Sequence, residues 1–271
     1  MGSNYLLAAA AGLIQGLTEF LPISSSGHLL IFHELFNFNV SDDVLFDVVL
    51  HLGTSVAIIT VFYRELLAIV RGFFSSLVKW NVREDSNQRM AWLLLLATIP
   101  AALIGVLFES AIENHLRSLW VVATTLIVFA LVLWAAEKYS TKNRTIKQLN
   151  WWQAVGLGCA QALALIPGVS RSGMTISTGL FMGLKRAEAA QFSFLLSLPI
   201  ILGAAAKKSL DINTSTGTDI GVMITGFLVS AITGYLVIRF LLQYLARHGF
   251  GIFIWYRLIV GIGLISWLAL R

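Results

Sequence analysis

The sequence predicts an all-α polytopic membrane protein, with six spanning helices plus two re-entrant helical hairpins in an inverted-topology repeat. The composition is the first observation behind this prediction. Of 271 residues, 57% are hydrophobic and only 12% are charged, and the mean hydropathy is +0.80, as expected of a chain that lies in lipid. The second observation is a set of uncharged or nearly uncharged stretches of spanning length, and the third is a pair of similar apolar segments interrupted by Pro, Gly and Ser.

Each spanning helix is predicted from a run of roughly 17 to 20 residues with little charge, which as a helix crosses about 30 Å of hydrocarbon. The six runs are residues 46–63, 91–108, 119–136, 189–206, 220–238 and 252–270. We expect one membrane domain over residues 1–271. The apolar run from Tyr5 lacks the flanking features of a cleaved signal peptide, so we expect it to stay in the mature protein.

The two interrupted segments cover residues 5–30 and 152–180, and they resemble each other. The first contains GLIQGLTEFLPISSSGH and the second GLGCAQALALIPGVSRSGM. At an offset of 146 positions, Gln15 aligns with Gln161, Ser24 with Ser170, Ser26 with Ser172, Gly27 with Gly173, and Phe46 with Phe192. We therefore expect a duplication, with repeat one over about residues 1–136 and repeat two over about residues 151–271.

Both segments are expected to be hairpins whose tips line a buried or watery cavity, because lipid cannot satisfy the backbone groups that Pro, Gly and Ser leave free. Each repeat then holds one hairpin and three spanning helices. Because three is odd, the second repeat is expected to be inverted relative to the first, so that the two hairpins enter from opposite faces and meet near the midplane.

The distribution of basic residues predicts the orientation. Residues 64–89, 138–147 and the pair Lys185 and Arg186 form three basic loops, which lie on one side in this arrangement and are therefore expected to be cytoplasmic. The opposite loops hold only Arg117, Lys207 and Lys208. The first hairpin and both termini would then face outward.

The tip of the first hairpin carries the parts of a hydroxyl nucleophile, a general base and a holder of charge or metal. Gln15 and Glu19 are four residues apart and share a helix face before the chain breaks at Pro22. The run Ser24-Ser25-Ser26-Gly27-His28 follows directly.

The second tip carries groups that suit a phosphate. The guanidinium of Arg171 is a planar fork of donors, and Gly and Ser at a helix start leave backbone N–H groups free for an anion. The residues concerned are Gly168, Ser170, Arg171, Ser172, Gly173 and Thr175. Together the two tips predict a phosphoryl site.

Structural roles compete with these functional ones. Glu19 could simply pair with Arg171, although ionisable groups at membrane depth are usually functional. The serines could serve helix packing in lipid. Asp47 and His51 could support the site or form an interfacial pair, and a final group is expected to be solvated: His33, Glu34, Asp42, Asp43 and Glu65.

Two further predictions are negative. The single cysteine, Cys159, excludes an intrachain disulfide and reads as a small apolar helix residue. The net charge of +5 comes from clusters at helix ends and not from a basic stripe with interleaved aromatics, so no nucleic-acid partner is expected.

The motifs QGLTEFLPISSSGH and PGVSRSG resemble the two signature regions of the undecaprenyl-pyrophosphate phosphatase family, also called the bacitracin-resistance protein family. The resemblance covers nearly the whole chain in segment order. It implies hydrolysis of undecaprenyl (polyprenyl) pyrophosphate to the monophosphate and inorganic phosphate, which recycles the lipid carrier for peptidoglycan synthesis, supports cell shape and confers bacitracin resistance. It also implies the bacterial plasma (inner) membrane, an active site open to the periplasmic side, a divalent cation such as Mg²⁺ or Ca²⁺, and contact with membrane lipids, and it leaves a homo-oligomer open.

The resemblance also assigns site residues. The catalytic ones are Glu19, Ser25, His28 and Arg171, with Ser24, Ser26, Ser170, Ser172 and Thr175 around them. From the second tip itself we add Gly168 and Gly173 to the substrate-binding residues. Glu19 and Gln15 would hold the cation, although Gln15 stands where the acidic motif can have a carboxylate, and an amide cannot act as a base. In the aligned tips Ser25 stands opposite Arg171. We expect Ser25 to attack the terminal phosphorus, with His28 or Glu19 as its base and Arg171 on the equatorial oxygens.

Two other functions were compared with this one. An inverted-repeat transporter or flippase for a polyprenyl phosphate would have the same fold, and only an activity measurement separates the two. The membrane phosphatases with a histidine nucleophile also use Ser-Gly-His and Ser-Arg elements. Their spacing requires His and Asp where this chain has Ser177 and Phe181, so we exclude that class.

Overall fold

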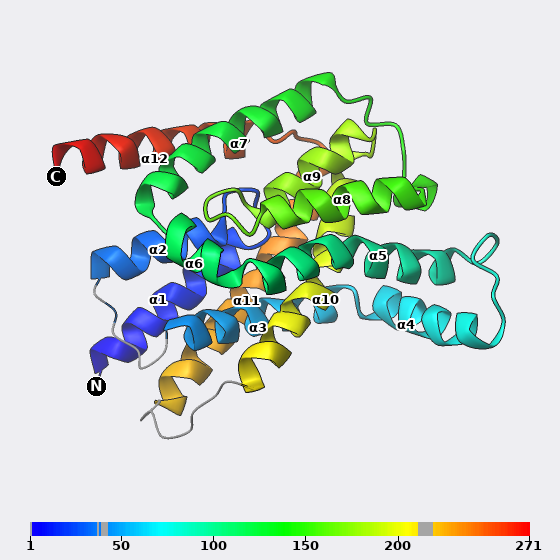
Figure 1. Ribbon diagram of the computed structural model, residues 1–271, viewed down its shortest axis with the longest axis horizontal. Coiled ribbons are helices and arrows are strands. Elements are labelled where there is room, and N and C mark those ends of the chain that lie inside the picture. The colour runs from blue at the N-terminus through cyan, green and yellow to red at the C-terminus, as the bar shows by residue number, and fades with distance from the viewer. Residues whose placement is uncertain (1, 37, 39–42, 211–218) are drawn as a thin grey trace.

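The chain forms a bundle of helices joined by short loops (Figure 1). The computed structural model describes residues 2–36, 38, 43–210 and 219–271, and this part of the chain contains no β-strand. Its helices are α1 (Gly2–Thr18), α2 (Ser25–Phe36), α3 (Asp43–Val61), α4 (Tyr63–Val78), α5 (Ser86–Leu107), α6 (Glu109–Leu116), α7 (Leu119–Tyr139), the 3₁₀ turn η1 (Ile146–Gln148), α8 (Trp151–Leu163), α9 (Arg171–Phe181), α10 (Arg186–Leu210), α11 (Ile220–Leu245) and α12 (Gly251–Leu270).

Six of the described helices, α3, α5, α7, α10, α11 and α12, are long and apolar enough to cross a membrane, as predicted. The main differences lie at their ends. The helix α10 begins at Arg186 rather than at residue 189, and α11 continues to Leu245 rather than to residue 238. Charged and polar residues end an apolar run, but they do not interrupt the backbone hydrogen bonds that define the helix.

The helix α4 was not predicted, because its basic residues were assigned to a loop. The chain breaks after α3 at Phe62 and resumes as a helix that packs beside α5. Its buried residues Ile69, Gly72 and Ser76 lie three and four positions apart, on one helix face. A Cβ on Gly72 would lie 2.7 Å from the carbonyl carbon of Asn87, so the glycine allows this close approach to the start of α5.

The two predicted hairpins are helix–loop–helix segments with matching local geometry. The chain leaves the helix after α1 and after α8, and the next helix begins at Ser25 and at Arg171. The aligned residues Ser24 and Ser170 both have positive φ, of 76° and 75°. Each accepts a hydrogen bond through its side-chain oxygen from the residue three positions on, Gly27 or Gly173. The two tips that align in the sequence therefore share a backbone conformation and a capping bond, while the duplication itself stays a prediction.

The packing between the halves is also reciprocal. The helix α1 packs on α11, and α8 packs on α5, so the first arm of each hairpin lies against a spanning helix of the other half. Aligned glycines make both approaches close: a Cβ on Gly12 would lie 2.5 Å from Gly226 O, and one on Gly158 would lie 2.5 Å from Ala97 O. Re-entry of the hairpins from opposite faces of a membrane stays a prediction.

The three basic loops meet at the end of the molecule that is on the right in Figure 1. Arg144 donates to the carbonyl of Met182 at 2.9 Å, and the N–H of Ile146 donates to Glu188 at 2.8 Å. Arg89 donates to the carbonyl of Leu149. Both the N- and the C-terminus lie at the opposite end, on the left in Figure 1.

Candidate active site

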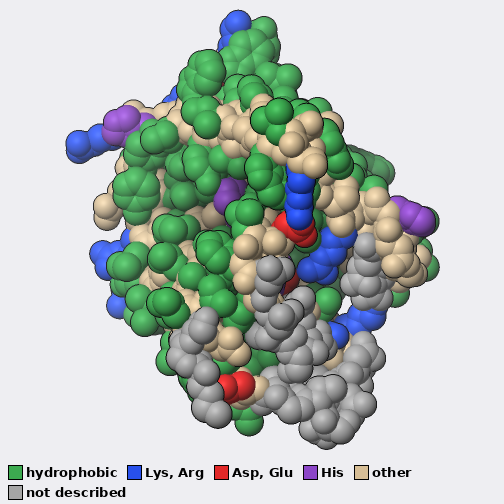
Figure 2. All heavy atoms as spheres, turned by 90° about the vertical axis from the view of Figure 1, so that its left-hand side faces the viewer, with side chains coloured by type: hydrophobic (Ala, Val, Ile, Leu, Met, Phe, Trp, Pro, Cys, Tyr) green, Lys and Arg blue, Asp and Glu red, His purple; other side chains and the backbone are tan. Residues whose placement is uncertain are grey.

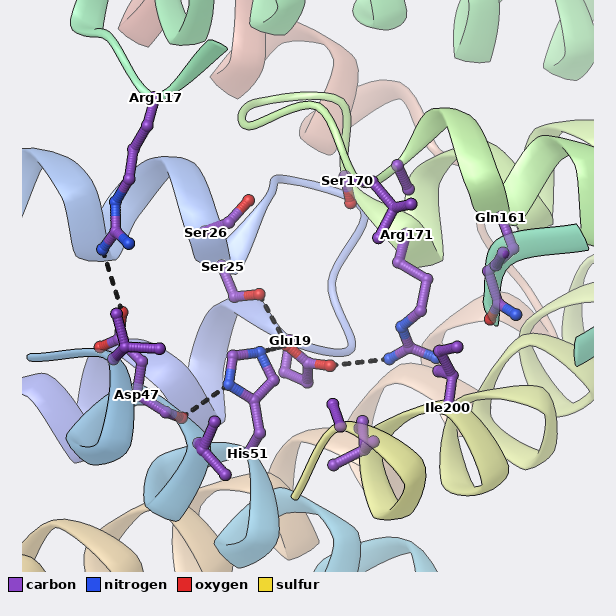
Figure 3. Close-up of a pocket in the computed structure, with 17 residues that line it drawn as sticks. Glu19, Ser25, Ser26, Asp47, His51, Arg117, Gln161, Ser170, Arg171 and Ile200 are labelled. Atoms are coloured by element: carbon purple, nitrogen blue, oxygen red, sulfur yellow. Dashed lines mark hydrogen bonds and ion pairs between the residues drawn. The ribbon is translucent and has the colours of Figure 1, made fainter. Parts of the chain in front are cut away.

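Glu19 lies at the centre of the cluster that joins the two hairpin tips (Figure 3). It follows the last residue of α1, and only 5% of its surface is exposed. Its Oε1 accepts from Arg171 Nη2 at 2.8 Å, and its Oε2 accepts from Ser25 Oγ at 2.6 Å and from Gln15 Nε2 at 3.0 Å. These three partners are donors, which is the environment of an ionised carboxylate and of a group that can receive a proton.

Ser25 is the first residue of α2, and its hydroxyl proton points at Glu19. A hydroxyl that donates a short hydrogen bond to a carboxylate is arranged as a nucleophile beside its base. Ser25 and Arg171 each open a helix, so α2 and α9 direct two N-termini, with their partial positive charge, at the same place.

Arg171 connects the second tip to two other parts of the fold. Besides its bond to Glu19, its Nη1 donates to the carbonyl of Ser193 in α10 at 3.0 Å. The ion pair that we considered as a purely structural explanation is therefore present. A guanidinium has five N–H donors, so these bonds leave further donors for an anion in the cavity that Arg171 lines.

This active-site cavity has a volume of about 280 Å³. Its polar walls combine groups from both tips with groups from α3 and from the segment before α7, while the far side is apolar. The polar lining residues are Glu19, Ser25, Ser26, Asp47, His51, Arg117, Gln161, Ser170 and Arg171. Figure 2 shows that, on the face at the end with the termini, acidic and basic side chains meet in a hollow among hydrophobic ones.

The histidine at the cavity is His51, and His28 lies apart from it. His28 Nδ1 lies 2.7 Å from Ser24 O, and its Nε2 lies 2.7 Å from the hydroxyl of Tyr256, on which its ring stacks. His51 Nε2, in contrast, lies 3.5 Å from Glu19 Oε2. The catalytic role of His28 stays a prediction without a contact to Ser25 or Glu19 in its support.

The protonation of His51 follows from its partners. Its Nδ1 lies 2.7 Å from the carbonyl oxygen of Asp47, which can only accept, so Nδ1 carries a hydrogen. In the neutral ring Nε2 is then free to take up a proton, and once protonated it can donate to Glu19. The Asp47 carboxylate in turn pairs with His33 Nε2 at 3.2 Å and faces Arg117 Nη2 at 3.6 Å.

The groups expected to be solvated differ from one another in the structure. His33 is largely buried in its pair with Asp47, and Glu65 is half-buried and accepts from Gln191 at 2.7 Å. Glu34 is exposed, as expected, and pairs with Arg271. Asp42 and the side chain of Asp43 lie outside the described residues.

Of the residues predicted to bind substrate, Ser26 and Ser170 line the cavity. The others make contacts that hold the tips. Ser172 donates to the carbonyl of Leu21 at 3.0 Å and so ties one tip to the other, and Thr175 donates to Ser193 at 2.6 Å. Ser24 and Gly173 belong to the helix caps, and Gly168 has a φ of 87° where a Cβ would collide with Thr125.

The fit of a divalent cation depends on Gln15. Its Oε1 is buried and finds no hydrogen-bond partner among the described residues, so it is an oxygen available to a cation. Both Glu19 oxygens already accept hydrogen bonds, and the described residues contain no group of three or more His, Cys, Asp or Glu that could hold a metal. An ion such as Mg²⁺ takes most ligands from water and substrate phosphates and only one or two from protein, so Gln15 and Glu19 would be its protein ligands and the cation stays a prediction.

Arg257 is the largest feature that the sequence analysis missed. This residue of α12 is fully buried and does not line the active-site cavity. It donates to backbone carbonyls of both hairpin loops and of α7. The acceptors are Pro22, Thr125, Leu126, Gly168 and Val169, at 3.0 to 3.3 Å. The signal was visible, since it is the one charged residue within the run 252–270, and such a residue marks a function or a buried network.

Comparison with known proteins gives a consistent result. The family model described as bacitracin resistance protein BacA matches residues 8–263. The undecaprenyl-diphosphatase of Rubrobacter xylanophilus is 46% identical over 255 residues, which cover 93% of this chain and 94% of that protein. The undecaprenyl-diphosphatases of Alcanivorax borkumensis and Aliivibrio salmonicida are 43% and 42% identical over 267 and 268 residues, 98% of this chain in each case and 100% and 99% of the relatives.

Proposed function

The chain belongs to the BacA family of bacitracin resistance proteins, and from this premise we propose that it is an undecaprenyl-diphosphatase. It hydrolyses undecaprenyl diphosphate to undecaprenyl monophosphate and inorganic phosphate, and so recycles the lipid carrier for cell-wall synthesis and confers resistance to bacitracin. The observation that carries the assignment of the site is the contact of Ser25 Oγ with Glu19 Oε2 at 2.6 Å, with Arg171 on the other carboxylate oxygen.

The first chemical step is transfer of the terminal phosphoryl group to Ser25. Ser25 Oγ attacks the terminal phosphorus, its proton passes to Glu19 Oε2, and the bond from that phosphorus to the bridging oxygen breaks to release undecaprenyl monophosphate. When Glu19 gains the proton its attraction for Arg171 weakens. The guanidinium can then neutralise the phosphoryl oxygens.

The second step restores the enzyme. Water attacks the phosphorus of phosphoserine and gives a proton to His51 Nε2, the bond to Ser25 Oγ breaks as Glu19 returns its proton to that oxygen, and phosphate leaves. His51 is also placed to exchange a proton with Glu19, because its Nε2 lies 3.5 Å from Oε2. Its Nδ1 already carries a hydrogen toward the carbonyl oxygen of Asp47, so Nε2 is the nitrogen that takes up the proton. Ser25 donates to Glu19, whereas His28 contacts Ser24 O and Tyr256, so Glu19 is the better supported base for Ser25.

A divalent cation, Mg²⁺ or Ca²⁺, fits this site as a companion of the diphosphate. Gln15 Oε1 and a Glu19 oxygen would hold it, and it would offset the negative charge of the phosphates. Ser26 and Ser170, which line the cavity, would position the phosphate oxygens.

The protein lies in the bacterial inner membrane in this proposal, with the active site open to the periplasmic side. The basic loops support that orientation, because they gather at the end of the molecule opposite the termini. Single cysteines at Asn143 and at Asn114, in a chain whose native cysteine is replaced by serine, should label from opposite faces of intact cells, Asn143 only after permeabilisation. Labelling of both from outside contradicts the orientation.

A transporter of the same fold is the second candidate, and a direct assay separates the two. Detergent removes the compartments that transport needs but leaves hydrolysis possible. Purified protein given farnesyl diphosphate and a divalent cation should release phosphate, and the Glu19→Gln variant is the control for a contaminating phosphatase. Release that does not depend on Glu19 contradicts the proposed site.

A further inference from the structure

A second and larger cavity, of about 660 Å³, runs beside the active-site cavity and is lined almost entirely by apolar side chains. Its walls come from α5, α6, α8 and α9, which neighbour one another in Figure 1. Within these helices the lining residues recur every three or four positions, so whole helix faces form the walls. They include Phe108, Ile112 and Leu116 at α6, Gly156, Cys159, Ala160 and Leu163 at α8, and Met174 and Thr178 at α9.

This apolar cavity adjoins the active-site cavity. Leu165, in the second hairpin loop, lines both the active-site cavity and the apolar one. A small cavity of about 190 Å³ shares lining residues with both: Ser26 and His51 with the active-site cavity, Ile112 with the apolar one, and Leu165 with each. The polar end of this path is where Ser25 meets Glu19.

The apolar cavity is also open toward the surroundings of the helices. Phe108, Cys159 and Leu163 all line it and are exposed on the surface of the chain. In a membrane such a surface faces hydrocarbon, so a long apolar chain can enter from the side without crossing water.

We propose that this cavity, which we call the prenyl groove, holds the isoprene units that follow the first one of the substrate's polyprenyl chain. The inference rests on the proposed function, since it needs a diphosphate at Ser25. The head and the tail of that lipid are covalently joined, so they must occupy adjoining polar and apolar sites. The groove is a large apolar space beside this polar site. Its volume is in the range of about 300–1,000 Å³ that suits a ligand of drug size. The groove is too small for the whole polyprenyl chain, so most of that chain stays in the lipid.

The effect of the groove is positional more than hydrophobic. A prenyl chain that leaves it enters detergent or lipid, which are as apolar as the groove, so burial itself gains little. Packing along the groove instead fixes the diphosphate relative to Ser25, and loss of orientation of that kind costs rate as well as affinity. We expect a blocked groove to lower kcat/KM by about tenfold for substrates that reach it.

The first test fills the groove from α8. Cys159→Trp should lower kcat/KM about tenfold for farnesyl and undecaprenyl diphosphate and leave dimethylallyl diphosphate, with its single isoprene unit, unchanged. The matched control is Ile259→Trp, an exposed position on α12 outside the groove, which should change none of the three. An equal loss for all three substrates in Cys159→Trp, or no loss for any, overturns the proposal.

The second test uses the native protein, because Cys159 is the only cysteine. A bulky aromatic maleimide should reproduce the effect of tryptophan, while a Cys159→Ser chain should be insensitive to the reagent. Undecaprenyl monophosphate should slow the labelling, and a diacyl phosphatidic acid at the same concentration should not. Equal protection by both overturns the proposal, since the groove then holds membrane acyl chains. Failure of the proposed function is distinct, because the unmodified protein would release no phosphate from any substrate.

Discussion

The substitution Arg171→Lys separates a guanidinium that binds the phosphoryl group from one that only balances Glu19. In the structure the guanidinium donates to Glu19 Oε1 at 2.8 Å and to Ser193 O at 3.0 Å. A lysine keeps the positive charge beside Glu19, but its compact ammonium replaces the planar fork and cannot also serve Ser193 and a phosphate oxygen in the same geometry.

The two roles predict different magnitudes. If Arg171 stabilises the transferring phosphoryl group, Arg171→Lys should lose about 10³-fold in kcat, roughly 4 kcal/mol of barrier, with little change in Tm. Arg171→Ala leaves the buried carboxylate of Glu19 without its cation, which costs about 3–5 kcal/mol and lowers Tm by roughly 6–20 °C for a chain of this size.

The assay is phosphate release at saturating farnesyl diphosphate, with thermal unfolding in detergent measured on the same preparations. The double variant Arg171→Ala/Glu19→Gln is the control, because it removes the stranded charge and should recover part of the Tm without recovering activity. An Arg171→Lys protein with native Tm and with kcat within about tenfold of the unchanged chain refutes the phosphate-binding role.

Three further predictions concern Glu19 and Gln15, the two histidines, and Arg257. Glu19→Gln should lose about 10²-fold in kcat because an amide cannot take the Ser25 proton, whereas Gln15→Glu should stay active with a changed metal-dependence profile; an inactive Gln15→Glu chain argues against a cation at that oxygen. His51→Gln should lower kcat while His28→Gln leaves it unchanged, and the reverse result restores His28 as the base. Arg257→Met should lower Tm and kcat together, with partial recovery of Tm in Arg257→Lys, and a native Tm in both shows that the loop carbonyls do not need the guanidinium.

The spanning helices could be predicted because lipid leaves few alternatives. Each crossing needs a long uncharged run with its backbone bonds satisfied internally, and such runs are visible in the sequence. The helix α4 was missed because it is not such an uncharged run. Its exposed face carries Arg64 and Arg71, and its buried face is only Ile69, Gly72 and Ser76, so hydropathy alone does not distinguish it from a basic loop.

Part of the candidate site was readable from the repeat. Glu19, Ser25 and Arg171 lie at the two tips, and a duplication whose hairpins meet brings the tips together, as their contacts show. His51 and Arg117 come from α3 and from the segment before α7, and only the tertiary packing decides that they reach the cavity. No spacing in the sequence carries that information.

His28 shows the opposite limit of sequence reasoning. It lies three residues after Ser25 on the same helix, so proximity in sequence favoured it as a base. The ring is nevertheless fixed by Ser24 O at one nitrogen and by Tyr256 of α12 at the other. A partner more than two hundred positions away thus sets the direction of the side chain.

The central claim is that Ser25 is the nucleophile of a phosphoryl transfer, and the turnover of Ser25→Ala tests it most directly. The account predicts a loss of about 10³-fold or more in kcat for farnesyl diphosphate at an unchanged Tm, because the variant lacks the oxygen that Glu19 deprotonates. It also predicts that protein quenched during turnover, with the terminal phosphate labelled, carries acid-stable label on Ser25 of the unchanged chain and none in the variant. A Ser25→Ala protein that turns over within about tenfold of the unchanged chain contradicts the account.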